Sequence, residues 1–273
     1  MSEAEGLQVS GGGWGSLSRA RALKAKLKRG EAALGAWLSL TDPCAAEVMA
    51  RVGLDFLLID TEHGAWDLVT LQTTLMGFNG TDTVPIVRVP WNDHVRIKQA
   101  LDMGVEGIMA PMVRTVAECR ELVRACHYPP QGGRGFGPRR ASNYYRNIDD
   151  YLAAANEAIF VMPQIEDIAT LDHLDEFLAV PGVDAVAIGP NDLSGTTGFF
   201  RKHQHPTNKG AVDKIIERAA AINLPVCLGV NSKPNEQQAL IARGVRVLLV
   251  TSDMELLAGG ARHILEANRA AIA

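Results

Sequence analysis

Eight short apolar segments, separated by helical patterns, constrain the fold more than any other feature of this sequence. They occupy residues 34–40, 55–60, 84–89, 106–112, 159–166, 183–189, 224–230 and 245–250. Strands that alternate with helices form a parallel sheet, because each return crossing is right-handed and covers a face of the sheet. The segments are apolar almost throughout, which is typical of strands buried on both faces. The sequence therefore predicts an α/β fold built on a parallel sheet.

Eight strand–helix units in about 240 residues match the count and size of a (β/α)8 TIM barrel. We predict one such domain over residues 17–273, after a polar, glycine-rich and disordered lead-in at residues 1–16. The alternative is a doubly wound open sheet. That fold would carry a glycine-rich turn after its first strand, and the segment LSLTDPCAAE contains none.

Charge and apolar runs argue against two classes of partner. The net charge is only −4, so neither a nucleic-acid groove nor attraction to an anionic membrane is indicated. No apolar run reaches the roughly 18 residues that span a bilayer, and the N-terminus lacks the pattern of a secretory signal. The four cysteines form no CxxC pair, which favours a reducing compartment. We expect a cytoplasmic protein without nucleic-acid or membrane partners.

Polar side chains follow the second and third predicted strands, where barrel enzymes place their catalytic residues. Asp60, Glu62 and His63 end the second strand, and Arg88 lies within the third. A carboxylate that holds one ring nitrogen of His63 would leave the other nitrogen to accept a proton. A core histidine bonded to a backbone carbonyl is the alternative. A buried guanidinium needs a partner, either a neighbouring strand-end acid or an oxygen of a ligand.

Two further acids follow the fifth and sixth strands. Glu166 and Asp192 come from neighbouring strands and could share a hard divalent cation, which takes oxygen ligands. Two solvated loop acids are the alternative. No lysine lies at a predicted strand end and no GxSxG motif occurs, so the pattern favours metal-assisted chemistry over a Schiff base or an acyl-enzyme.

Residues 127–151 interrupt the alternation of strands and helices. The segment is too long for a tight connection, and long loops on barrels are usually functional or disordered. Its arginines and tyrosines suggest contact with an anionic group or a neighbouring subunit.

The segments LGAWLSL, DFLLIDTEHG, VPIVRVP, IMAPMVRT, GGRGFGPRRAS, MPQIED and VAIGPNDLSGTTG resemble, in order and spacing, the HpcH/HpaI family of class II pyruvate aldolases. The resemblance runs from about residue 33 to residue 250. It implies a (β/α)8 barrel, a homo-hexamer (a trimer of dimers) and a C-terminal helix exchanged between subunits. It also implies a carbon–carbon lyase that cleaves a 2-keto-4-hydroxy acid to pyruvate and an aldehyde.

The same resemblance implies roles for individual residues. Glu166 and Asp192 would hold a divalent metal, Mg²⁺ or Mn²⁺ with Co²⁺ as a further candidate. Arg88 would stabilise the enolate oxygen of pyruvate, and His63, oriented by Asp60, would handle the proton. Substrate contacts would come from Trp37, Gln164, Gly189, Pro190 and Asn191.

Two other functions remain open at this point. An oxaloacetate decarboxylase, or a carbon–carbon bond-forming enzyme resembling macrophomate synthase, would need the same enolate chemistry. A catalytically silent barrel that binds small acids is the third possibility. Fold alone does not decide between them.

Overall fold

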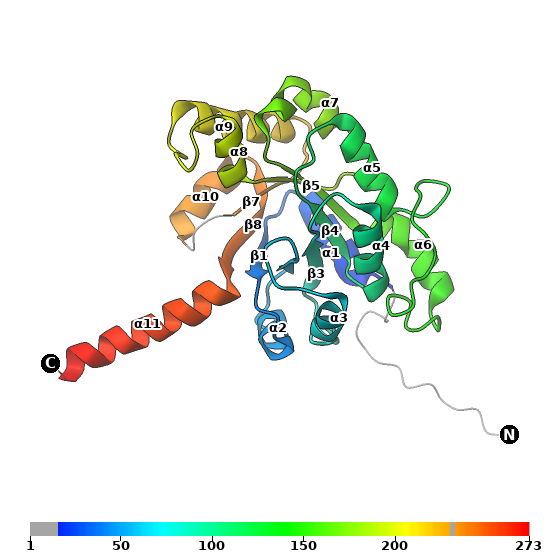
Figure 1. Ribbon diagram of the computed structural model, residues 1–273, viewed down its shortest axis with the longest axis horizontal. Coiled ribbons are helices and arrows are strands. Elements are labelled where there is room, and N and C mark those ends of the chain that lie inside the picture. The colour runs from blue at the N-terminus through cyan, green and yellow to red at the C-terminus, as the bar shows by residue number, and fades with distance from the viewer. Residues whose placement is uncertain (1–15, 230–232, 273) are drawn as a thin grey trace.

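The computed structural model describes residues 16–229 and 233–272, and its centre is a closed barrel of eight parallel strands (Figure 1). Each strand pairs with the next along the chain, and β8 pairs with β1. The strands are β1 (Ala33–Leu38), β2 (Phe56–Asp60), β3 (Val84–Arg88), β4 (Gly107–Ala110), β5 (Phe160–Ile165), β6 (Val186–Ile188), β7 (Val226–Gly229) and β8 (Val245–Ser252). The predicted TIM barrel is confirmed.

Helices follow each strand and surround the barrel (Figure 1). They are α1 (Ser18–Lys28), α2 (Pro43–Ala50), α3 (Leu68–Met76), α4 (His94–Met103), α5 (Val116–Cys126), α6 (Ile148–Ala158), the 3-10 helix η1 (Ile168–His173), α7 (Leu174–Leu178), α8 (Pro190–Thr196), α9 (Pro206–Ala221), α10 (Pro234–Ala242) and α11 (Asp253–Ile272). Several begin with a side-chain cap, which satisfies amides that have no partner within the helix. The hydroxyl of Thr115 and the carboxylate of Glu118, for example, form a capping box at α5.

The strands separate two apolar layers, because successive side chains of a strand point to opposite faces. Phe56 and Leu58 of β2 point into the barrel, where they meet Phe160 and Met162 of β5. The alternate residues of the strands pack outward against the helices. Apolar residues at almost every strand position therefore serve both layers.

Helix α1 closes the N-terminal end of the barrel. Leu23 and Leu27 join the inner apolar layer. The buried carboxylate of Glu106 fixes the helix, accepting hydrogen bonds from Arg19 Nε (2.7 Å) and from the amide of Ala20 (3.0 Å). With this end covered, the C-terminal strand ends remain as the place for a site.

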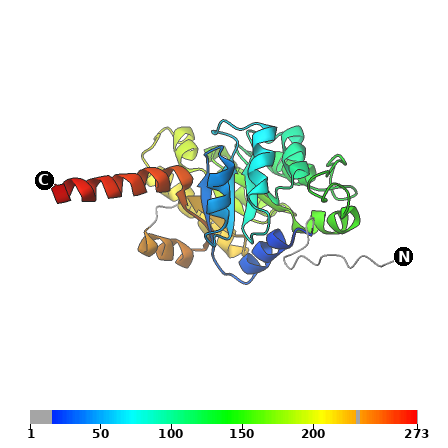
Figure 2. The same cartoon turned by 90° about the horizontal axis from the view of Figure 1, so that it is seen from below.

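Helix α11 leaves the barrel as a projecting arm (Figures 1 and 2). Its first residue, Asp253, is buried and accepts hydrogen bonds from the amides of Ser39 and Leu40. Beyond it the apolar side chains are uncovered, with Leu257 and Ile264 exposed by 67% and 64%. Among the described residues, no helix is both long enough and apolar enough to cross a membrane. The predicted lead-in falls on residues 1–15, outside the described part of the chain, and on Ser16.

The segment between α5 and α6 is anchored by its arginines. Arg134 is buried and donates to the hydroxyl of Tyr151 (2.9 Å) and to the carboxylate of Asp102 (2.7 Å). Arg140 is buried as well and donates to the carbonyl oxygen of Met103 (2.7 Å). These two arginines hold the segment against the barrel, and the anionic group that Arg134 contacts is Asp102 of the same chain.

Candidate active site

The register of β2 and β3 places Asp60 directly beside Arg88. Arg88 donates from Nε to Asp60 Oδ1 (2.9 Å) and from Nη2 to Asp60 Oδ2 (2.8 Å). Its guanidinium also lies over the ring of Trp37, 4.4 Å from the ring centroid, and 3.2 Å from Glu62 Oε2. A two-point carboxylate contact and a stacking contact both favour a fixed guanidinium plane. Arg88 is therefore a positioned positive charge at the strand ends.

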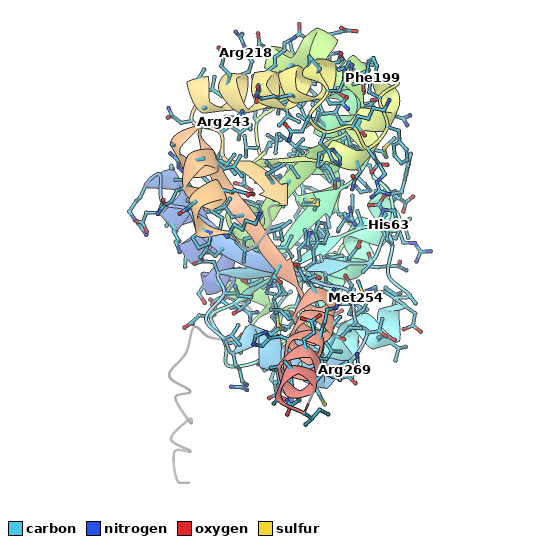
Figure 3. The ribbon with its side chains drawn as sticks, turned by 90° about the vertical axis from the view of Figure 1, so that its left-hand side faces the viewer. His63, Phe199, Arg218, Arg243, Met254 and Arg269 are labelled. Carbon is cyan, nitrogen blue, oxygen red and sulfur yellow. The ribbon has the colours of Figure 1, made fainter. Side chains whose placement is uncertain are left out.

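Asp60 has a different partner from the one predicted. Both of its oxygens serve Arg88, and Oδ1 also faces the amides of Glu62 (3.2 Å) and His63 (3.4 Å). The side chain of His63 is 67% exposed at the rim of the molecule, where Figure 3 labels it. Its Nε2 lies 3.7 Å from Glu62 Oε2. The expectation that Asp60 orients the imidazole of His63 is not met by this geometry.

Glu166 follows β5 and is almost fully buried, with 2% of its surface exposed. Its Oε1 accepts a hydrogen bond from the amide of Met112 (2.6 Å), and its Oε2 accepts one from Gln164 Nε2 (2.7 Å). Burial raises the pKa of this carboxyl to about 7; the charges of Glu62 and Asp192 also raise it, whereas the Met112 amide and the charge of Arg88 lower it. The carboxylate is thus fixed in place, within reach of two further carboxylates and one guanidinium.

Gly189 brings helix α8 against this carboxylate. A Cβ atom at Gly189 would lie 2.3 Å from Glu166 Oε2 and 2.6 Å from Gln164 Nε2, which is too close for any other residue. Pro190, Asn191 and Asp192 then form the first turn of α8. The sequence predicts only that these residues follow the sixth strand. The structure adds that glycine at position 189, which has no side chain, allows the start of α8 to approach Glu166 closely.

The donors suit a hard cation that keeps open coordination positions. No group of three or more His, Cys, Asp or Glu side chains that could hold a metal ion occurs within residues 16–229 and 233–272. Two carboxylates, Glu166 and Asp192, are close enough for the charge of Asp192 to raise the pKa of Glu166. Mg²⁺ is commonly held by one or two carboxylates, with water or substrate oxygens completing its shell. The pair fits such an ion.

The amide of Met112 is the contact that reasoning from sequence missed. Met112 has a φ of 52°, in the left-handed region that non-glycine residues seldom occupy. This conformation accompanies the hydrogen bond from its amide to Glu166 Oε1. No residue type in the segment IMAPMVRT signals that turn, because methionine has no preference for positive φ.

The fold and the site together define a class of enzyme: a (β/α)8 barrel with a fixed guanidinium facing buried carboxylates at its C-terminal strand ends. The chain belongs to the HpcH/HpaI aldolase/citrate lyase family, whose sequence profile matches residues 33–259. It is 40% identical to 4-hydroxy-2-oxo-heptane-1,7-dioate aldolase from Salmonella arizonae over 89% of this chain and 92% of the relative.

Two further relatives agree with this assignment. Hydroxypyruvate/pyruvate aldolase from Roseobacter denitrificans is 36% identical over 88% of this chain and 94% of the relative. The crystal structure of macrophomate synthase superposes with a TM-score of 0.80 at 27% identity, covering 94% of this chain and 91% of that chain. The protein is a pyruvate aldolase, a carbon–carbon lyase, and the predicted family and enzyme class are confirmed.

Proposed function

We propose that the enzyme cleaves 4-hydroxy-2-oxo acids to pyruvate and an aldehyde with the help of a divalent cation, Mg²⁺ or Mn²⁺, with Co²⁺ as a further candidate. One observation carries the proposal. The buried Glu166 carboxylate is fixed by two donors and lies within the electrostatic reach of Asp192, Glu62 and Arg88. The named aldolase activities of the two relatives described above support it.

The chemistry needs positive charge beside the keto oxygen of the substrate. Breaking the bond between C3 and C4 of the substrate leaves an electron pair that becomes an enolate, with its charge on that oxygen. Arg88 is held by Asp60 and Trp37, so its charge is in place before the reaction and needs no reorganisation. A cation held by Glu166 and Asp192, when bound, would supply further positive charge at the same oxygen.

His63 is proposed to take the proton of the 4-hydroxyl group. An imidazole can accept and return a proton at a reacting oxygen, which suits that task. His63 is exposed at the rim, which suits contact with an arriving substrate. Gln164, Gly189, Pro190, Asn191 and Trp37 are proposed to line the site. The Oε1 atom of Gln164 is buried without a hydrogen-bond partner among the described residues, so it remains available to a ligand.

We also propose that α11 is exchanged between subunits of a homo-hexamer. Its apolar side chains are uncovered within the chain, with Met254, Leu256 and Leu265 each about half exposed. Such a continuous apolar surface is characteristic of an interface. A helix from another subunit would cover the apolar face and would complete the barrel's outer layer beside β8 and β1.

The proposed compartment is the cytoplasm. Cys44, Cys119, Cys126 and Cys227 are all free thiols, as expected in a reducing environment. The proposed partners are small molecules only: a keto acid, pyruvate or oxaloacetate, and an aldehyde.

Activity after metal removal and restoration tests the proposal. We expect dialysis against EDTA to abolish cleavage of 4-hydroxy-2-oxo acids, and Mn²⁺ or Mg²⁺ to restore it. Asp192→Asn should prevent restoration, whereas the control Asp175→Asn, which alters an exposed acid paired with Arg218 on α9, should behave as wild type. Full activity in the metal-free protein would contradict the cation's role. Turnover of oxaloacetate in place of hydroxy acids would assign a decarboxylase instead.

A further inference from the structure

We infer that the 3-10 helix η1 positions the proposed cation-binding acids, and that Thr170 and His173 do so through the carbonyl group of Arg114. The inference rests on the proposed function, because it concerns the cation that Glu166 and Asp192 are proposed to hold. It makes Thr170 and His173 positioning residues, which act through the backbone after β4 and not on the cation or the substrate.

The turn after β4 provides one of the two donors that fix Glu166. The amide of Met112 donates to Glu166 Oε1 at 2.6 Å, from a residue whose φ is 52°. A non-glycine residue is strained in that conformation, which persists only where the surrounding structure holds it. The contacts that hold this turn therefore determine whether the amide faces the carboxylate.

Two side chains of η1 hold the turn. Thr170 is fully buried, and its hydroxyl donates to the carbonyl oxygen of Arg114 at 3.1 Å. Nε2 of His173 lies 2.9 Å from the same oxygen, and it carries the hydrogen because a carbonyl oxygen can only accept. Arg114 is two residues beyond Met112, so both hydrogen bonds restrain the strained turn at its far end.

The remaining contacts of η1 tie it to both acids. Asp167 directly follows Glu166, and its side chain caps η1. The amide of Ile168 donates to Oγ1 of Thr196 at 2.9 Å, and Thr196 is the last residue of α8. Asp192 lies in the first turn of that helix. Helix η1 thus links the strand end that carries Glu166 to the helix that carries Asp192.

An ion pair joins the same two turns but contributes less. Arg114 Nε lies 3.1 Å from Asp167 Oδ2, and the arginine side chain is 45% exposed. Exposed ion pairs are screened by solvent and contribute little to stability. A hydrogen bond from a fully buried hydroxyl is electrostatically stronger, because the protein interior has a low dielectric constant. The positioning effect is therefore assigned to Thr170 and His173 rather than to the ion pair.

Calorimetric titration of the full-length chain with Mn²⁺ tests the inference. Thr170→Val removes the hydroxyl and keeps the shape of the side chain, and we expect it to raise the Kd for Mn²⁺ about 3- to 10-fold, the size of one net hydrogen bond. Thr170→Val/His173→Leu leaves the Arg114 carbonyl without either donor and should raise the Kd by at least about tenfold. Thr170→Ser keeps the hydroxyl and should bind Mn²⁺ as wild type does.

Thr83→Val is the matched control for a merely structural role. Thr83 is also buried, and its hydroxyl donates to the carbonyl oxygens of Ala50 and Leu54, each at 2.8 Å. It lies just before β3, at the opposite end of the barrel from the acids. Both valine variants should lower the Tm of the metal-free protein, but only Thr170→Val should weaken Mn²⁺ binding.

Mn²⁺ binding that is as tight in Thr170→Val and in the double variant as in Thr83→Val would overturn the inference. Where Thr170→Val fails to fold by circular dichroism, His173→Leu decides by the same comparison.

Asp192→Asn separates the inference from the proposed function, because it should abolish Mn²⁺ binding whatever η1 does. Wild-type affinity in Asp192→Asn would reject the proposed cation site and the inference with it. Loss of binding in Asp192→Asn, with unchanged binding in Thr170→Val, would reject only the positioning role of η1.

Discussion

Replacing Gly189 with alanine tests the arrangement of Glu166 most sharply. The added Cβ would lie 2.3 Å from Glu166 Oε2 and 2.9 Å from Glu166 Cβ, where ordinary contact begins at 3.4 Å. Gly189 has a φ of −97°, which alanine adopts without strain, so the effect is steric. Either the carboxylate or the start of α8 must move by about 1 Å, because the interior is close-packed.

The expected magnitude follows from the contacts that would be lost. Retreat of the carboxylate weakens its hydrogen bonds to the Met112 amide and to Gln164, and bonds to a charged group contribute about 1.5–3 kcal/mol each. Partial relaxation would leave an unfolding free energy lower by about 1–3 kcal/mol, the range for overpacked cores. Loss of such supporting contacts lowers metal affinity by about 10- to 100-fold.

Calorimetric titration with Mn²⁺ and thermal unfolding of the metal-free protein measure the two effects. Gly195→Ala is the matched control, since a Cβ there meets only Phe200 at 3.5 Å and lies inside the same helix. That variant should bind Mn²⁺ as wild type and gain up to about 1 kcal/mol of stability from helix propensity. Wild-type Mn²⁺ affinity in Gly189→Ala would refute the close contact between α8 and Glu166.

Three further predictions concern other residues. Arg88→Lys should lower kcat by about 10²- to 10³-fold, because lysine cannot make the two-point contact with Asp60. Circular dichroism should show an intact fold, and a kcat near the wild-type value would remove Arg88 from the mechanism. Burial lowers the pKa of His127 to about 4, whereas in the unfolded chain the imidazole is protonated below about pH 6.5. The free energy of unfolding should therefore be highest above pH 6.5 and should fall by up to about 3 kcal/mol as the pH drops towards 4. His127→Gln should flatten the denaturant-unfolding profile over that window, and an unchanged slope would show that the imidazole is not buried neutral. A chain that ends at residue 255 keeps Asp253 but lacks the apolar arm, and light scattering should show smaller assemblies than the full chain forms; an unchanged mass would exclude α11 from the interface.

The barrel could be predicted from sequence because its strands are apolar on both faces. The number of apolar segments and their alternation with helical patterns are sufficient to indicate eight parallel strands. The strand boundaries are predicted less well: β6 is Val186–Ile188, whereas the apolar segment runs over residues 183–189. Val183 belongs to the turn before the strand and packs against the core without pairing in the sheet. Hydrophobicity reports burial, and burial extends beyond the hydrogen-bonded strand.

The contacts at the site could be predicted only in part. The sequence indicated which residues end each strand, but the pairing of Asp60 with Arg88 depends on the register between β2 and β3. The proximity of Asp60 and His63 along the chain suggested a contact between their side chains, whereas the closed barrel offers Asp60 a guanidinium from the next strand. An ion pair with a neighbouring strand-end acid was one of the two partners foreseen for Arg88. The Met112 amide could not be foreseen, since it depends on one backbone torsion.

Exchange of the methyl protons of pyruvate with deuterium oxide tests the central claim most directly, because it requires enolate formation and no aldehyde. With Mn²⁺ or Mg²⁺ present, we predict loss of the methyl signal in proton NMR spectra at a rate that falls at least tenfold in Arg88→Lys and vanishes in Asp192→Asn. Exchange that proceeds equally in metal-free enzyme and in both variants would contradict the claim that these groups stabilise a pyruvate enolate.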